Sequence, residues 1–445
     1  MNLSSLGDCG DGRCLSGRAL LLSRLPFVLV MIAAMFSALL CNAAPRPMSI
    51  DDLYEIKNVT ALALSPDGKQ LAYLSEIPRG RLDSLHQELW LMDIQSWTTT
   101  RVSAGKAIYN VQWSPDGATL SYFSLREDEQ QMHLYELSSS EERSLLATSV
   151  NQANGLLEVF MCHWAPSGRE LACIVRPKSR YDAVEGHPSR TPKSLTMGDS
   201  QELSMKRARF LREDYFLAIV DASTGRSRQI THGAIKPSLN SHSVDWAPDG
   251  KSLLFIGYDK PLLDVYDSIR ESDVFSANLE TGELRNLGGT AGADSQPFWS
   301  ANGREVFFYG NGSRDVYASG QTGIRRLDVL SGKTTTLFSG RVTDLRLLGS
   351  RDQLLGKRRS HGNEQLFTIS TTSGQVRQLT PTDMTVIDYS VAKDGSTVAM
   401  ILSSASKLPE IYLGAVRGGS FRQISDLYAE ERANFVCSSG TGELA

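Results

Sequence analysis

Short alternating runs of apolar and polar residues, separated by turn residues, fill most of the chain from residue 49 to residue 427. One phrase recurs among them: an apolar residue or Trp, then Ser-Pro-Asp-Gly or a variant, then a second alternating run. Alternation of period two predicts β-strands, and the Pro, Asp and Gly between the runs predict a tight turn. Gly closes this turn because it adopts a positive φ without strain. The phrase therefore predicts a β-hairpin at residues 64–68, 113–117, 164–168, 246–250, 299–303 and 391–395.

The spacing of these turns predicts how many units the chain contains. Their glycines are 49, 51, 82, 53 and 92 residues apart. The interval of 92 equals two periods of 46, so we place a degenerate copy at residues 350–355. The interval of 82 equals one period plus about 30 inserted residues. A second phrase, an apolar strand followed by a polar turn and a short polar strand, occurs seven times, as at residues 215–231.

Seven units of about fifty residues, each with room for four short strands, predict an all-β fold: a seven-bladed β-propeller of four-stranded blades. A linear solenoid is the alternative, but its units are usually shorter. A Trp precedes the turn in four units, and we expect these rings to pack between neighbouring sheets. They are Trp113, Trp164, Trp246 and Trp299.

Residues 1–44 do not follow the repeat. Arg13, Arg18 and Arg24 precede an apolar run at residues 25–40, and small residues follow it. This order predicts a secretory signal peptide and therefore an exported protein, periplasmic or secreted. An uncleaved anchor is the alternative, although the run is short for a membrane span. Membrane contact is expected only through such an uncleaved segment.

Composition and charge exclude several classes of function. The chain has 445 residues, 41% of them hydrophobic and 22% charged, which is globular. With 46 Lys and Arg against 50 Asp and Glu, the net charge of −4 gives no reason to expect nucleic-acid binding. The sequence contains no phosphate-binding loop, no dinucleotide-binding glycine motif and no zinc-peptidase motif. We therefore assign no cofactor, no metal site and no catalytic residue.

Cys162 and Cys173 lie on either side of the third turn. If residue numbers that sum to 335 face each other, the two cysteines are cross-strand neighbours, Trp164 faces Leu171, and Phe160 faces Val175. In an oxidising compartment this arrangement predicts a disulfide. The alternative is two buried free thiols.

The third unit carries an insertion at about residues 176–214. Its segment 205–212 is mildly amphipathic and rich in Arg. One interpretation is a solvated loop. The other is that the insertion lies over a propeller face and contacts substrate or a partner, because loops on rigid scaffolds commonly bind. The candidate contact residues are Arg207, Arg209, Arg212 and Glu213.

The Trp-Ser-Pro-Asp-Gly hairpin and the polar turn of the second phrase resemble the repeats of two families of propellers. One is the N-terminal propeller of prolyl-oligopeptidase-type serine peptidases, including dipeptidyl-aminopeptidase and acylaminoacyl-peptidase relatives. The other is the TolB-type periplasmic propeller. The segment 49–68 is similar to the start of the peptidase propeller, and lasso-peptide isopeptidases share this architecture. The likeness implies a propeller at residues 45–427 and a tail at residues 428–445.

The peptidase resemblance also implies an α/β-hydrolase domain with a nucleophile motif, G-x-S-x-G. The sequence contains no such motif, and we expect that domain to be absent. The expected function is that of a substrate-gating propeller, truncated and inactive alone, whose partners are a peptide substrate and a hydrolase domain or protein. The alternative is a self-standing TolB-type propeller that binds proteins. An enzyme with its site in the propeller channel is a third option without a supporting motif.

Overall fold

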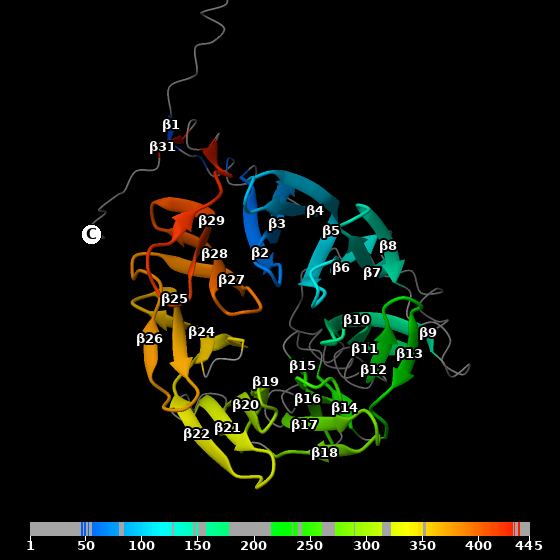
Figure 1. Cartoon of the computed structure of the whole chain (residues 1–445). Coiled ribbons are helices and arrows are strands. Elements are labelled where there is room, and N and C mark those ends of the chain that lie inside the picture. The colour runs from blue at the N-terminus through cyan, green and yellow to red at the C-terminus, as the bar shows by residue number, and fades with distance from the viewer. Residues whose placement is uncertain are drawn as a thin grey trace, which may run out of the picture. The chain divides into compact units, whose positions relative to one another are not determined.

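A computed structural model provides the structure of the chain, and its secondary structure consists almost entirely of β-strands (Figure 1). The residues that it describes are 46, 47, 49, 52, 56–79, 84–126, 129–145, 148–149, 157–177, 215–233, 235–238, 243–259, 272–288, 290–313, 322–349, 353–429, 431 and 435–436. The signal peptide expected at residues 1–44 therefore lies outside the described residues, and so does most of the insertion. No helix among the described residues has the length and apolarity to cross a membrane.

The chain divides into two units. The smaller one contains a pair of short parallel strands, β1 (Arg46–Pro47) and β31 (Phe435–Val436). The larger one includes Ser49–Tyr428 and forms the propeller.

Seven blades of antiparallel strands follow one another around a ring in chain order (Figure 1). Blades 1 and 2 form one continuous sheet because β5 is the outermost strand of blade 1 and continues as the innermost strand of blade 2. The strands of this sheet are β2 (Asn58–Leu64), β3 (Gln70–Arg79), β4 (Ser84–Asp93), β5 (Thr99–Trp113), β6 (Thr119–Arg126), β7 (Glu129–Glu136) and β8 (Glu141–Leu145).

Blades 3 and 4 each carry one strand more than the basic four. In blade 3, β9 pairs in parallel with the outermost strand. In blade 4, the innermost strand is broken into β14 and β15, which both pair with β16. The strands are β9 (Thr148–Ser149), β10 (Leu157–Trp164), β11 (Glu170–Pro177), β12 (Phe216–Asp221) and β13 (Arg226–Gln229), then β14 (Lys236–Pro237), β15 (Val244–Trp246), β16 (Ser252–Tyr258), β17 (Asp273–Asn278) and β18 (Leu284–Asn286).

Blades 5, 6 and 7 are regular four-stranded sheets. The prediction of a seven-bladed propeller with four-stranded blades is therefore confirmed. The strands are β19 (Asp294–Trp299), β20 (Glu305–Gly310), β21 (Gly323–Asp328), β22 (Thr334–Ser339), β23 (Thr343–Leu347), β24 (Gln353–Ser360), β25 (Asn363–Ser370), β26 (Val376–Gln378), β27 (Thr385–Val391), β28 (Thr397–Ser404), β29 (Lys407–Ala415) and β30 (Arg422–Gln423).

The apolar core consists of separate clusters between adjacent blades. Trp113, Trp246 and Trp299 are buried, each in a cluster that includes residues of the preceding blade. Trp164 is partly buried and packs against a cluster that includes residues of blade 2. The prediction that these rings pack between sheets is confirmed. A similar cluster joins blade 7 to blade 1, although no strand is shared between them among the described residues.

The turns between the first two strands also touch one another from blade 7 through blades 1 and 2 to blade 3. A Cβ atom on Gly117 would lie 3.5 Å from Cδ of Pro66 in the preceding turn, and Gly168 is close to Pro115 in the same way. Both glycines have a φ near +70°, as the turn prediction requires. The backbone N–H of Lys393 donates to the carbonyl of Pro66 at 3.0 Å, so blade 7 meets blade 1 through its turn as well.

The innermost strands share an irregularity that the repeat phrase did not predict. The register shifts within the innermost strand of every blade except blade 4, where the strand is broken instead. In blade 3, Val159 faces Val175 and the next pair is Met161 with Ile174. The expected pairing of Phe160 with Val175 is therefore wrong, because a bulge inserts one unpaired residue there. Trp164 does face Leu171.

Candidate functional site

The bulged innermost strands are linked to one another by side chains. At each junction between neighbouring blades, a side chain of one blade forms a hydrogen bond with a backbone group of the next, and this includes the junction that closes the ring. Such bonds satisfy backbone groups that a bulge or a strand edge leaves unpaired. The donor and acceptor pairs are Trp113 with Ala63, Gln112 with Cys162, Trp246 with His163, Trp299 with Asp245, Leu345 with Gln296, Tyr389 with Asp344, and Leu62 with Asp388.

A cavity of about 590 Å³ lies along four of these strands, from blade 3 to blade 6. Its volume is in the range of pockets that hold small ligands, about 300–1,000 Å³. All of its lining residues belong to innermost strands or to the turn or segment beside them, so it opens on the inner side of the ring. Its wall combines aromatic and proline rings with four polar side chains, those of His163, Asp245, Gln296 and Arg346.

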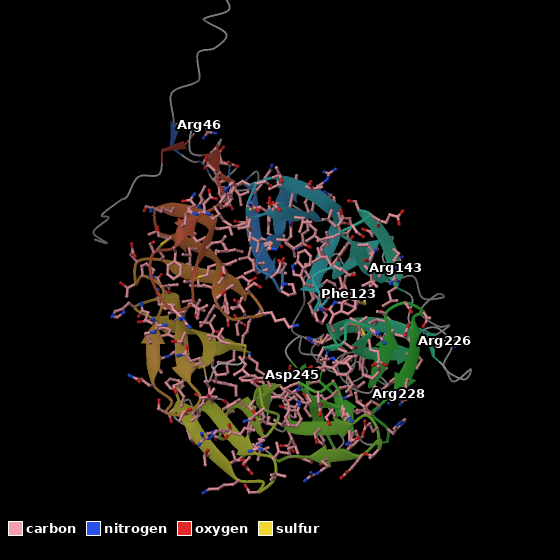
Figure 2. All side chains as sticks on the ribbon, viewed as in Figure 1. Arg46, Phe123, Arg143, Arg226, Arg228 and Asp245 are labelled. Atoms are coloured by element: carbon pink, nitrogen blue, oxygen red, sulfur yellow. A yellow bond between two sulfur atoms is a disulfide. The ribbon has the colours of Figure 1, made fainter. Side chains whose placement is uncertain are left out.

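Asp245 is the acidic group of this wall, and Figure 2 shows it on the inner side of the ring. One of its carboxylate oxygens accepts the backbone N–H of Trp299 at 2.8 Å. Burial raises the pKa of Asp245 to about 7, and the backbone N–H groups of Trp299 and Trp246 oppose this rise. In the part of the chain that the structure describes, no Lys or Arg forms an ion pair with this carboxylate.

Trp299 differs from the other tryptophans at its repeat position. The indole N–H groups of Trp113 and Trp246 donate to a backbone carbonyl of the preceding blade, at 2.8 Å and 3.0 Å. The ring of Trp299 is only 8% exposed, yet its Nε1 has no hydrogen-bond partner among the described residues. Leaving a buried donor unpaired costs about 1–3 kcal/mol. This donor belongs to a residue that lines the cavity.

Arg346 carries the positive charge of the cavity wall, and this charge interacts with residues of blade 7. The guanidinium of Arg346 lies 5.3 Å from the ring centre of Tyr389 in blade 7. Burial raises the pKa of Asp388, and the charges of Arg346 and Lys357 oppose that rise. Lys357 also forms an ion pair with Asp344 at 2.6 Å. The cations thus balance the acids of blades 6 and 7.

A Ser-His-Glu chain of contacts in blade 2 has the residue types of a hydrolytic triad. Oγ of Ser124 lies 2.9 Å from Nε2 of His133, and Nδ1 of His133 lies 3.2 Å from Oε1 of Glu142. Ser124 and His133 are 1% and 0% exposed. A substrate has no access to the hydroxyl, so this chain of contacts is structural and links the three outer strands of the blade.

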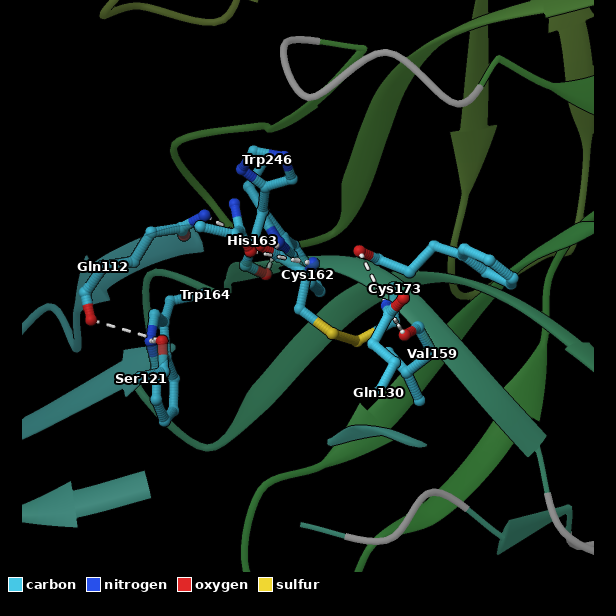
Figure 3. Close-up of a disulfide and its surroundings, with 11 residues drawn as sticks. Gln112, Ser121, Gln130, Val159, Cys162, His163, Trp164, Cys173 and Trp246 are labelled. Atoms are coloured by element: carbon cyan, nitrogen blue, oxygen red, sulfur yellow. Dashed lines mark hydrogen bonds between the residues drawn. A yellow bond between two sulfur atoms is a disulfide. The ribbon is translucent and has the colours of Figure 1, made fainter. Parts of the chain in front are cut away.

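The cysteines of blade 3 occupy facing positions on neighbouring strands (Figure 3). Cys162 on β10 faces Cys173 on β11, their Cα atoms are 4.1 Å apart, and their sulfurs are bonded. Gln112 of blade 2 donates to the carbonyl of Cys162 at 2.8 Å. Cys162 precedes His163, which lines the cavity. By loop length, a disulfide between residues 11 apart stabilises by about 2–3 kcal/mol.

The other predicted site residues cannot be placed. Arg207, Arg209, Arg212 and Glu213 lie outside the described residues, so the contact assigned to them stays a prediction. The sequence analysis gave no binding role to Asp245, Trp299 or Arg346. The one signal for Asp245 was an acidic residue directly before a repeat Trp, where Gln, His or Phe stands in the other three units with a Trp. Among the described residues, no group of acidic, His or Cys side chains is arranged to hold a metal ion.

Two curated proteins that are similar to this chain carry peptidase names. No family model matches the chain. An uncharacterized peptidase, YuxL of Bacillus subtilis, is 25% identical over 238 residues, 51% of this chain and 33% of the relative. Dipeptidyl-peptidase 5 of Porphyromonas gingivalis is 21% identical over 355 residues, 76% of this chain and 50% of the relative. The chain spans a third to a half of the length of these curated relatives.

Solved structures show the same architecture. The acylaminoacyl peptidase of Pyrococcus horikoshii superposes with a TM-score of 0.57 at 13% identity, over 86% of this chain and 54% of that one. The propeller domain of the trilobed protease of Pyrococcus furiosus superposes with a TM-score of 0.56 at 11% identity, over 84% of this chain and 99% of that one. The resemblance to peptidase propellers expected from the repeats is therefore confirmed at the level of the fold.

Proposed function

We propose that this propeller selects peptides for a serine peptidase of the prolyl-oligopeptidase type. The observation that carries the proposal is the inner cavity, which has the size and mixed wall of a ligand site. Aromatic and proline rings there offer apolar contacts to side chains, and Asp245, Gln296 and Arg346 offer partners for the polar groups of a peptide backbone. The peptidase relatives support the choice of a peptide.

The chemical step in this proposal belongs to an α/β-hydrolase domain. This sequence supplies no G-x-S-x-G motif, and the Ser-His-Glu chain of blade 2 is closed to substrate. The propeller would bind the peptide and control its access to the hydrolase nucleophile. An exported location is part of the proposal, supported by the signal pattern at residues 1–44. The isopeptidase subfamily stays a prediction.

The test is peptide retention by the full chain. The protein is mixed with a pool of acetylated, amidated pentapeptides, and the retained peptides are identified by mass spectrometry after ultrafiltration. We expect retention of a subset of the peptides and no cleavage products. Ala301 lines the cavity, so Ala301→Trp should abolish retention by filling it. Leu330 is 91% exposed in a turn of the same blade, so Leu330→Trp should leave retention unchanged.

Retention that is absent, or that survives Ala301→Trp, would contradict the proposal. A folded chain that binds no peptide but binds a whole protein would favour the TolB-type alternative. The hydrolase partner is tested separately with a fluorophosphonate probe, which labels the active serine of serine hydrolases. A labelled hydrolase that co-purifies with the chain and cleaves the retained peptides would support the complete proposal.

A further inference from the structure

Among the residues that the structure describes, no Lys or Arg forms an ion pair with the carboxylate of Asp245. The carboxylate accepts the backbone N–H of Trp299, and the described ionisable side chains that line the cavity with it are those of His163 and Arg346. Arg346 stacks on Tyr389 and acts on Asp388 in blade 7. A carboxylate that is partly removed from water is costly unless it is paired, and the half-buried Asp245 therefore has unused capacity to bind a positive charge.

The surroundings of this carboxylate suit an organic cation. The rings of Trp246 and Trp299 line the same cavity. Aromatic faces attract ammonium and guanidinium groups, with Trp the most effective ring. A carboxylate beside two tryptophans fits a cationic side chain carried on a peptide.

We infer that the cavity binds a Lys or Arg side chain of a peptide, with the carboxylate of Asp245 as its counter-ion and Trp246 and Trp299 beside it. This inference rests on the proposed peptide-selecting function and adds the class of peptide selected. If Asp245 and the two tryptophans only lined a channel, a peptide would need no positive charge to bind there. Peptides with a basic residue are therefore preferred over neutral peptides of the same shape.

The experiment compares peptides that differ in one charge. Acetylated, amidated Ala-Ala-Lys-Ala-Ala is titrated into the full chain at pH 8 by calorimetry, and the peptide with norleucine in place of Lys is the isosteric control. A second pair compares Arg with citrulline. We expect each basic peptide to bind about tenfold or more tightly than its neutral partner, as charge-assisted contacts in a desolvated site do. A lysine peptide with a free N-terminus should bind no better than the acetylated one.

Two variants and a matched control test which residues cause the preference for basic peptides. Asp245→Asn should remove the preference for Lys over norleucine, and Asn still accepts the N–H of Trp299. Asp388→Asn is the matched control, since Asp388 accepts a backbone N–H at another junction, and it should keep the preference. Trp299→Phe leaves a less effective ring for a cation, so it should weaken the lysine peptide more than the norleucine peptide.

Each of the other possible binding results contradicts a particular part of the inference or of the proposed function. Equal affinity for the basic and neutral peptides contradicts this inference and leaves the proposed function standing. Absence of binding by every peptide contradicts both. A preference that depends on the free N-terminus, or that survives Asp245→Asn, shows that the cation is not recognised as inferred.

Discussion

Two junctions of the ring are built with the same bond but in different surroundings. At the junction of blades 4 and 5, Asp245 accepts the N–H of Trp299 at 2.8 Å. At the junction of blades 7 and 1, Asp388 accepts the N–H of Leu62, also at 2.8 Å. Burial raises the pKa of both carboxyl groups.

The two junctions differ in whether nearby cations balance the charge of the carboxylate. Arg346 and Lys357 act on Asp388, and their charges oppose the rise in its pKa. Within the described part of the chain, no such cation acts on Asp245, and a cavity lies beside it. A carboxylate whose charge is balanced is part of the structure, whereas an unbalanced one beside a cavity has the features of a binding site. The lesson is that repeated positions in a propeller acquire function through their neighbours, because the bond they share is structural.

Among the variants of these junctions, Asp388→Ala is expected to lower the free energy of unfolding most. It leaves the N–H of Leu62 without its acceptor and removes a carboxylate on which the charges of Arg346 and Lys357 act. We expect the free energy of unfolding to fall by about 2–3 kcal/mol in denaturant titrations at pH 8. Asp245→Ala should cost clearly less, since it also removes an unbalanced charge. Equal losses in the two variants would contradict the distinction between the junctions.

Lys357→Met should give the next largest effect. It removes the ion pair with Asp344 and one of the two charges that act on Asp388, the other being that of Arg346, so it brings this junction closer to that of Asp245. We expect a loss of about 1–2 kcal/mol at pH 8, measured by chemical denaturation. Lys69 forms an exposed ion pair with Asp67, so Lys69→Met is the control and should cost under about 0.5 kcal/mol. A loss no larger than that of the control would show that Lys357 does not balance this junction.

Asp245→Asn should stabilise the protein, and only at higher pH. The folded-state pKa of Asp245 is about 7, above the ordinary value of 3.8. The folded protein therefore binds more protons between these pH values than the unfolded chain does, and this group lowers stability as the pH rises through them. The penalty is complete above about pH 7.

We expect Asp245→Asn to exceed the wild type by about 1–2 kcal/mol in free energy of unfolding at pH 8, with no difference near pH 4. Asp294 also has a pKa raised to about 7 by burial, so the wild-type profile alone is not informative. The difference between the two proteins isolates Asp245. A difference that does not change with pH would mean that this carboxylate is not strained by burial.

The smallest expected effect is a difference in stability between the Phe variants of Trp246 and Trp299. Trp246→Phe loses the bond to the carbonyl of His163 and should cost about 1 kcal/mol beyond the change in ring size. Trp299→Phe loses a donor without a partner. It should cost about 0.5 kcal/mol less than Trp246→Phe, or nothing beyond the change in ring size. Thermal unfolding of the two variants gives the comparison. A larger loss from Trp299→Phe would show that its N–H is bonded in the folded protein.

The local chemistry of the sequence determined the architecture. The turn residues, their spacing and the alternation beside them predict seven four-stranded blades, because a hairpin depends on residues that are adjacent in the chain. The facing positions of Cys162 and Cys173 follow from the same turn. The likeness to peptidase propellers also rests on these repeated residues.

Tertiary structure alone decided the site. The bulges displace the innermost strands by one residue, which is why the pairing of Phe160 with Val175 was wrong. The bond from Trp299 to Asp245 joins residues 54 apart, and that from Leu62 to Asp388 joins residues 326 apart. Whether a carboxylate is balanced depends on which blades lie beside it, and a repeat phrase is the same in every blade. The sequence therefore determined the ring of blades, and the packing of one blade against the next decided where an unbalanced charge and a cavity coincide.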